Sequence, residues 1–256
     1  MTEPAPAPES RPSKTSWLTG ARAGYIALGV SVVALGLAAA PWFTGANVRS
    51  YLLNHPEVLQ EASAALQDKE AQARVDTIND LAQTNAALLK PDPRDPAFGP
   101  VDAKVTVIEF FDFRCPGCKA VAHDYRALMA AHPEVRFVFK DWPILDRGED
   151  VTSQYAARAA LAAHQQGKYL EVYDALMTEP ALTPQAVDRI LSEHGVDLTR
   201  AKAAISAIDT TRHIADIHTT AAALQLQGTP TFFVNGRASP SIDPAEIGRL
   251  IEAAKR

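Results

Sequence analysis

Residues 105–118 of this 256-residue chain read VTVIEFFDFRCPGC, and this stretch decides the fold. Residues 105–111 are a β-rich apolar run, which is typical of a buried strand. Residues 119–131 predict a helix, because their larger apolar residues recur at helical spacing. Residues 135–140 predict a second strand. A strand, a helix and a strand within about 35 residues form a βαβ unit, so we expect the two strands to be parallel.

The sequence on the carboxyl side of this unit predicts a helical block, a hairpin and a last helix. Residues 151–226 have an almost entirely helical pattern, with glycine and proline between the segments. A strand is expected at 231–234, and Asn235-Gly236 after it is a strong hairpin signal. Asp243 and Pro244 are typical of a helix start. The chain is therefore expected to be of the α/β class.

Composition excludes several classes of protein. Hydrophobic residues make up 47% and charged residues 21%, which rules out a chain that is disordered throughout. The chain has 25 Lys and Arg against 30 Asp and Glu, for a net charge of −5, and it has no basic block. We therefore expect no nucleic-acid partner, because phosphate contacts need clustered cations. Its 2 cysteines are too few for a disulfide framework or a four-thiolate metal site.

The amino-terminal region predicts a disordered tail, 1–22, followed by a transmembrane anchor, 23–43. No residue of 23–43 is charged, and a helix of this length would span about 31 Å, close to the hydrocarbon thickness of a bilayer. The cations before it predict that everything after it is exported, which in a bacterium means a single-pass inner-membrane protein with its domain in the periplasm. A cleaved signal peptide is the alternative, with candidate cleavage sites at 38–40 and 44–46.

Residues 44–90 predict a helical stalk. Apolar residues recur through 47–89 at spacings of mostly three, four or seven, and Pro56 with Glu57 is typical of a helix start. Such a helix cannot bury its apolar stripe alone. It must pack on the domain that follows or on a copy of itself, so a homo-oligomer through 47–89 and a folded-back helix both stay open. The proline-rich stretch 90–96 ends this region.

The two cysteines, Cys115 and Cys118, lie where the first strand gives way to the helix. The free amides and the dipole at a helix start stabilise negative charge, and Arg114 adds a cation if it points toward the thiol. Pro116 fits the first helical turn, and Cys118 follows one turn later. These features lower a thiol pKa and favour a pair that cycles between dithiol and disulfide. A structural disulfide is disfavoured by the short loop, and a zinc site would need ligands beyond His123.

Two neighbouring segments add candidates for the site. Glu109 lies within the apolar strand, so we expect it to be partly buried and a candidate proton acceptor for Cys118 through water. Lys140, at the end of the neighbouring strand, is a candidate partner for it, although both could form a purely structural ion pair. Thr229-Pro230 precedes a strand and is a candidate cis bond, with an ordinary trans bond as the alternative.

The motifs EFFDFRCPGCK at 109–119 and GTPTFFVNG at 228–236 resemble those of the DsbA-like thiol–disulfide oxidoreductases of the thioredoxin superfamily. The resemblance covers roughly 97–255 and implies a thioredoxin-like domain at 91–256 with a DsbA-type helical insertion at about 146–226. The stalk sequence VRSYLLNHPEVLQEA, at 48–62, is more weakly similar to the oligomerisation region of ScsC-type proteins.

The resemblance also implies roles for the site residues. Cys115 would be the exposed nucleophile and Cys118 the resolving thiol. Glu109 would be the buried acid of the family, and Lys140 its basic neighbour. One departure is the pair between the cysteines, which is Pro-Gly where DsbA itself has Pro-His. The loss of that imidazole argues against assuming strong oxidising power.

Substrates would contact the loop that faces the cysteines. The resemblance implies that Thr229 and Pro230, joined by a cis bond, present backbone groups to a substrate strand, beside Pro116 and Gly117. The implied activity is the formation, reduction or isomerisation of disulfides in exported proteins, reset by a redox partner protein. We expect no metal and no organic cofactor. The alternative is a non-catalytic module that holds client proteins or copper.

Overall fold

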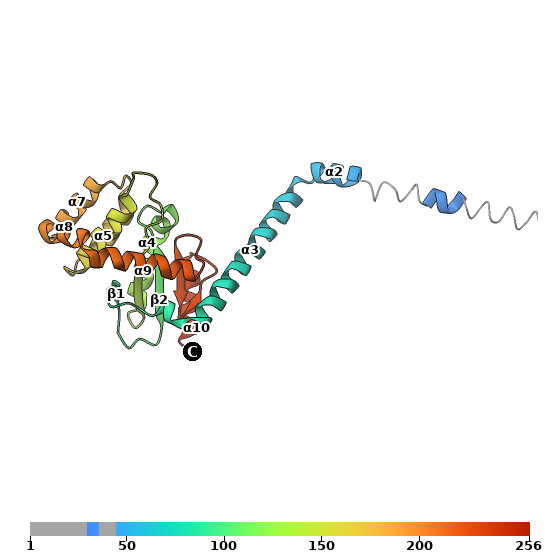
Figure 1. The fold of residues 1–256 in the computed structure, drawn as a ribbon. Helices are drawn as coiled ribbons and strands as arrows, with labels where there is room; N and C mark the ends of the chain where they lie inside the picture. Colours follow the sequence, from blue (N-terminus) through green and yellow to red (C-terminus); the bar gives the residue numbers. More distant parts are fainter. Residues whose placement is uncertain (1–29, 36–44) are drawn as a thin grey trace, which may run out of the picture. The chain divides into compact units, whose positions relative to one another are not determined.

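The computed structural model describes residues 30–35 and 45–256, which form two compact units (Figure 1). One unit ends at Gln67 and contains α2 (Gly45–Asn54) and the first part of α3 (Pro56–Thr84). The other unit is Asp68–Arg256. Among the described residues, no helix is both long and apolar enough to cross a membrane. The predicted tail, 1–22, and the predicted anchor, 23–43, lie outside the described residues except for a helical stretch at 30–35.

The second unit is built on a five-stranded sheet with the order β1-β3-β2-β4-β5. β2 (Thr106–Phe111) and β3 (Arg136–Asp141) are parallel, as the βαβ pattern predicts. β4 (Thr231–Val234) and β5 (Arg237–Ala238) form the predicted hairpin, with positive φ angles at Asn235 and Gly236 that Asn-Gly adopts readily. The two-residue β1 (Ala97–Phe98), antiparallel to β3, was not predicted because it is too short to show a pattern.

Helices cover the sheet and form a block between β3 and β4. The helix after the cysteine motif is α4 (Pro116–Ala131), and the last is α10 (Pro244–Ala254). The block contains α5 (Thr152–His164), α6 (Tyr169–Thr178), α7 (Pro184–Glu193), α8 (Leu198–Ser206) and α9 (Ile208–Ala223). Caps at the starts of α7, α8 and α10 come from the side chains of Thr183, Asp197 and Asp243.

Each face of the sheet has its own core, and this separation positions the site. Along β2, Val107 and Phe111 face a core shared with α4, α6 and α10, whereas Ile108 and Phe110 face a core shared with α9. Side chains alternate between the two faces of a strand. Glu109 therefore faces the side of α4 and α6.

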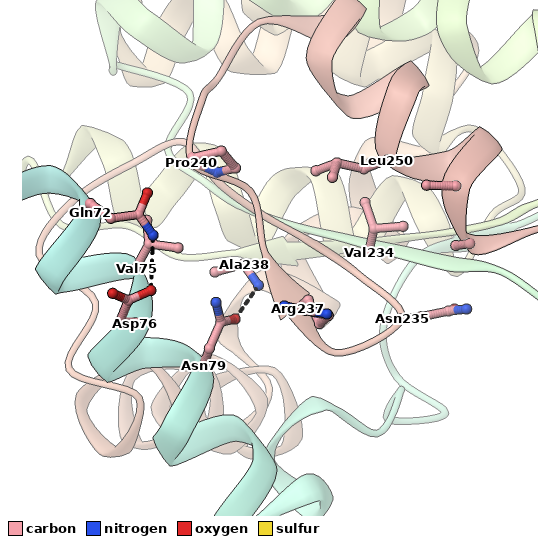
Figure 2. Close-up of a pocket in the computed structure, with 12 residues that line it drawn as sticks. Gln72, Val75, Asp76, Asn79, Val234, Asn235, Arg237, Ala238, Pro240 and Leu250 are labelled. Carbon is pink, nitrogen blue, oxygen red and sulfur yellow. Dashed lines mark hydrogen bonds between the residues drawn. The ribbon is translucent and has the colours of Figure 1, made fainter. Parts of the chain in front are cut away.

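The part of α3 that belongs to the second unit packs on the domain. Val75, Ile78 and Leu81 lie against the core beside α9, and the Asn79 side chain accepts a hydrogen bond of 2.8 Å from the Ala238 amide. Figure 2 shows this bond beside a cavity of about 550 Å³ between α3, the β4–β5 hairpin and α10. The folded-back alternative is thus confirmed for this part of the stalk, which covers the edge of the sheet at β5.

The first unit leaves apolar side chains exposed. Tyr51 and Leu53 of α2 are 55% and 64% exposed, and Leu59 and Leu66 of α3 are 54% and 57% exposed. Burying a leucine side chain is worth about 1.5–3 kcal/mol, so this row of exposed residues is costly in water.

Candidate active site

Cys115 and Cys118 occupy the start of α4. Cys115 is the residue before the first helical position, with extended backbone angles, and Pro116 opens the helix as predicted. The Lys119 amide donates to the Cys115 carbonyl over 3.0 Å, so the two cysteines are one helical turn apart. Both are free thiols in the structure. The expectation of an exposed Cys115 is wrong, because its side chain packs in the core and is only 8% exposed, although the neighbouring Pro116 is exposed. Cys118 is fully buried.

The loop before β4 lies directly against Cys115. The Cys115 thiol donates to the Thr229 carbonyl over 3.1 Å, and the Thr229–Pro230 peptide bond is cis. A Cβ on Gly117 would lie 3.3 Å from Pro230 Cδ and 3.7 Å from Cys115 Sγ, so glycine permits the close approach. The fold therefore brings Cys115 and Gly117 together with Thr229 and Pro230, which lie more than 100 positions later in the sequence.

The surroundings of Cys115 favour its thiolate. A hydrogen bond from the Cys118 thiol is the main cause that lowers the pKa of Cys115 from 9.0 to about 5, and the amides of Cys118 and Gly117 add to it. These amides are the free groups at the helix start that the sequence predicts. Arg114 has another role: its guanidinium pairs with Asp150 at 2.7 Å and with Asp146 at 3.5 Å.

The surroundings of Cys118 favour its protonated thiol. Burial raises its pKa far above the ordinary value, and the neighbouring Cys115 and Glu109 raise it further. One thiol is thus ionised at neutral pH while the other keeps its proton. Because a thiolate is the nucleophile in disulfide exchange, this asymmetry makes Cys115 suited to attack and Cys118 suited to resolution.

Glu109 is fully buried on the same side of the sheet as α4. Burial and the nearby Asp141 raise its pKa well above the ordinary value. The Tyr173 hydroxyl donates to Glu109 Oε2 over 3.5 Å, and no described residue bonds to Oε1. A buried carboxyl with a raised pKa can hold a proton and release it, so Glu109 stays a candidate for proton exchange with Cys118.

The predicted pairing of Glu109 with Lys140 is wrong. Lys140 Nζ lies 2.6 Å from Asp95 Oδ2, and both side chains are almost fully buried. The strand register explains the difference, since Glu109 is opposite Phe139 whereas Lys140 is opposite Phe110. Glu109 and Lys140 therefore face opposite sides of the sheet. Lys140 belongs to a buried ion pair on the α9 side.

Asp141 is the group near Glu109 that the sequence reasoning missed. It follows Lys140 and faces the same side of the sheet as Phe139 and Glu109. It is 1% exposed, and the Tyr169 hydroxyl donates to its Oδ2 over 3.0 Å. Burial raises the pKa of Asp141 to about 8. The alternation of side chains along 135–141 would have placed Asp141 on the same face of the sheet as Phe139.

Asp112 is a second missed residue, and it holds the cysteine loop in place. Its carboxylate accepts hydrogen bonds from the Arg114 amide at 2.7 Å and from Ser153 Oγ at 2.9 Å. It also accepts from the amides of Ile144 and Leu145 at 2.8 and 3.0 Å. Asp112 therefore joins the loop before Cys115 to the segment that follows β3. The sequence does contain a signal for this role. Asp112 directly follows a strand, and an aspartate there often accepts a hydrogen bond from the backbone amide two residues later.

Metal ligands do not gather in the part of the chain that the structure describes. No group of three or more His, Cys, Asp or Glu side chains within these residues is placed to hold an ion. His123, the nearest candidate in sequence, is 93% exposed and bonds to Asp124 at 3.1 Å.

Two family models match the chain. One, described as thioredoxin, matches 91–253, and the other, the N-terminal domain of the copper resistance protein ScsC, matches 45–73. The first covers more than half of the chain, including both cysteines and the cis-proline loop. The chain belongs to the thioredoxin family. Its redox pair, cis-proline loop and helical insertion place it in the DsbA-like branch of that family, as the sequence motifs indicate.

Individual relatives agree with this family. The chain is 30% identical over 163 residues to the thiol:disulfide interchange protein DsbA of Dickeya dadantii, covering 60% of this chain and 78% of that protein. The crystal structure of a thioredoxin-like oxidoreductase from Silicibacter pomeroyi is 38% identical, with a TM-score of 0.59, and the match covers 64% of this chain and 94% of that chain.

Another relative is a much longer protein. The chain is 36% identical over 145 residues to a Na(+)/H(+) antiporter, NhaA 3, of Salinispora tropica. The match covers 56% of this chain but only 22% of the antiporter. The chain thus spans only about a fifth to a quarter of the length of several curated relatives that it matches.

Proposed function

We propose that this protein is a thiol–disulfide oxidoreductase that acts on exported proteins through Cys115 and Cys118. The observation that supports this most is the asymmetry of the two thiols. Cys115 has a pKa of about 5 and contacts the cis-proline loop, whereas the pKa of the buried Cys118 is raised. This arrangement gives one nucleophile and one resolving group, as a two-step exchange requires.

In the oxidising direction the protein starts with a Cys115–Cys118 disulfide. A client thiolate attacks Cys115 Sγ, the bond between the cysteines breaks, and Cys118 leaves as a thiolate. Glu109 supplies the proton that Cys118 takes up. A second client thiolate then attacks the client sulfur of the mixed disulfide and releases Cys115 as a thiolate. The client loses two electrons and the protein gains them.

In the reducing direction the Cys115 thiolate attacks a client disulfide and releases one client thiol. Cys118 then loses its proton to Glu109 and attacks Cys115 Sγ, which releases the second client thiol. Isomerisation stops before this second step. A stabilised Cys115 thiolate favours the reduced protein, which makes the pair a better oxidant than an ordinary cysteine pair. A redox partner protein would reset the pair in either direction.

We propose a location at the bacterial inner membrane, with the thioredoxin-like domain in the periplasm. The uncharged run 23–43 and the cations before it support this location. A reporter fused to the carboxyl end tests it, because the reporter should be active only outside the cytoplasm. Activity of a reporter that works only in the cytoplasm would contradict the proposal.

Turnover of a protein disulfide tests the activity itself. We expect the reduced protein to accelerate insulin reduction by dithiothreitol and to reactivate scrambled ribonuclease. Cys115→Ser should abolish both effects. Tight binding of clients or copper without any turnover would contradict the enzyme and would favour the binding module.

We also propose that the first unit of the stalk self-associates. The match of 45–73 to the ScsC N-terminal domain and the exposed Tyr51, Leu53, Leu59 and Leu66 support this. A second copy would bury these side chains and bring several active sites into one particle, which favours isomerisation over simple oxidation.

Replacing two of these leucines tests the self-association. A fragment that begins at Asn47 should sediment above monomer mass, and Leu59→Lys combined with Leu66→Lys should return it to monomer mass, because buried lysines are costly. Gln60→Lys, an exposed change on the same helix, is the matched control and should keep the higher mass. Sedimentation of the unchanged fragment as a monomer would refute the oligomer.

A further inference from the structure

A groove of about 300 Å³ runs from the cis-proline loop to α3. Its walls are formed by Arg74, Val75 and Ile78 of α3, by the loop that contains Pro230, and by the segment 239–242, which ends in Ile242. All of these residues belong to the second unit. We call this feature the Arg74 groove.

Two residues that line the Arg74 groove, Pro230 and Ile242, also lie close to Gly117 at the cysteine pair. A Cβ built on Gly117 would lie 3.3 Å from Pro230, 3.7 Å from Cys115 Sγ and 3.8 Å from Ile242 Cδ1. Pro230 and Ile242 both line the groove, so one end of it lies beside the nucleophile. A polypeptide joined to Cys115 through a mixed disulfide would therefore have this groove next to its bonded cysteine.

The hydroxyl groups of the groove are already occupied by the protein. Thr231 Oγ1 donates to the Gly228 carbonyl at 2.8 Å, and Ser239 Oγ donates to the Ser241 carbonyl at 2.6 Å. The lining of the groove is more apolar than polar, although it includes the side chain of Gln227, and Ile242 is 43% exposed. The groove thus offers apolar contacts and few free polar groups, which suits the side chains of a client polypeptide.

Arg74 is the charged group of the groove. No ion pair or hydrogen bond joins its side chain to any residue in the described part of the chain. Its position is fixed by the helix, because Val75, Ile78 and the Asn79–Ala238 bond hold α3 against the sheet. An unpaired guanidinium at a fixed place beside an apolar surface is suited to bind a carboxylate.

We propose that Arg74 gives the exchange site a preference for client segments that carry an acidic side chain near the reacting cysteine. This inference rests on the proposed exchange activity and assigns it a substrate class. It also gives the folded-back part of the stalk a role in the site. Arg74 is a specificity residue and takes no part in the exchange itself.

Peptide disulfides that differ in one charge test the proposal. The full chain is given mixed-disulfide peptides that carry Glu, Gln or Lys at one position, from two to five residues on either side of the cysteine. At one or more positions we expect kcat/KM for the Glu peptide to exceed that for the Lys peptide by about fivefold at low salt. In 0.5 M salt the preference should fall below twofold, because the contact is near the surface.

Charge reversal at Arg74 supplies the decisive comparison. Arg74→Glu should reverse the preference toward the Lys peptide. Arg237→Glu, a matched reversal at an exposed arginine that lines the other cavity, should leave the preference unchanged. Reduction of hydroxyethyl disulfide, which is too small to reach Arg74, should proceed at the same rate in all three proteins and so confirm their fold.

The possible failures are distinguishable. Equal rates for Glu and Lys peptides in the unchanged protein, or a Glu preference that survives Arg74→Glu, would overturn the groove proposal and leave the exchange activity standing. Failure of the unchanged protein to react with any peptide or with hydroxyethyl disulfide would overturn the proposed function, and the groove proposal with it.

Discussion

Replacing Cys115 with serine lowers the rate of disulfide exchange by on the order of 10³-fold or more, because the attacking thiolate is removed. A hydroxyl beside the same amides has a far higher pKa and stays protonated at neutral pH. Insulin reduction by purified protein measures the loss. Circular dichroism of the same sample checks that the variant is folded.

Cys118→Ser gives a different result and serves as the matched comparison. Cys115 still attacks, but no second thiol releases the client, so the mixed disulfide accumulates. A covalent adduct with a client peptide should appear on a non-reducing gel and disappear with dithiothreitol. Adduct formation by Cys115→Ser in place of Cys118→Ser would reverse the assigned roles and contradict the account.

Replacing Asp141 with asparagine makes the protein more stable at alkaline pH. The folded pKa of Asp141 is about 8, against an ordinary value of 3.8. Between these two values the native state keeps a proton that the unfolded state releases, so stability falls as pH rises through this window. The fall is at most about 1.4 kcal/mol per pH unit. Asparagine cannot ionise, and it can still accept the hydrogen bond from Tyr169.

Urea denaturation of reduced protein at pH 5 and pH 8 measures this effect. The stability of Asp141→Asn relative to the unchanged protein should increase by about 2–4 kcal/mol between the two pH values. Asp102→Asn, at an exposed aspartate, is the control and should show no such increase. An equal difference at both pH values would mean that Asp141 is already ionised in the folded protein.

The local pattern of the sequence predicted most of the fold. The alternation and spacing in 105–140 gave the parallel pair β2 and β3 with α4 between them, and Asn235-Gly236 gave the hairpin. Proline and capping residues gave the helix starts at Pro116, Pro184 and Pro244. These features depend on short-range geometry, which a sequence records directly. The short β1 depends on pairing with β3 and left no pattern.

The charged groups around the site were harder to predict. The sequence placed Glu109 and Lys140 at the ends of neighbouring strands, but it did not fix the register, and the register puts them on opposite faces. Asp141 escaped notice because it adjoins the more obvious Lys140. The ion pairs of Arg114 were hard to predict for a similar reason. Their partners, Asp146 and Asp150, lie in the loop between β3 and α5, whose path the sequence pattern does not show.

The stalk was also predicted only in part. Its helical periodicity was evident, but the residue at which the helix leaves the domain was not, because both parts carry the same apolar spacing. Val75 and Ile78 meet the domain core, whereas Leu59 and Leu66 stay exposed. Only the tertiary fold separates the apolar residues that pack on the domain from those that stay exposed.

Alkylation of the reduced protein across pH measures directly whether Cys115 is ionised while Cys118 keeps its proton. Iodoacetamide labelling followed by mass spectrometry gives the rate at each cysteine between pH 3 and pH 10. The account predicts that Cys115 reacts first, with a midpoint near pH 5, and that Cys118 reacts far more slowly throughout. A Cys115 midpoint near 9, the ordinary value for a thiol, or faster labelling of Cys118, would contradict the proposed chemistry.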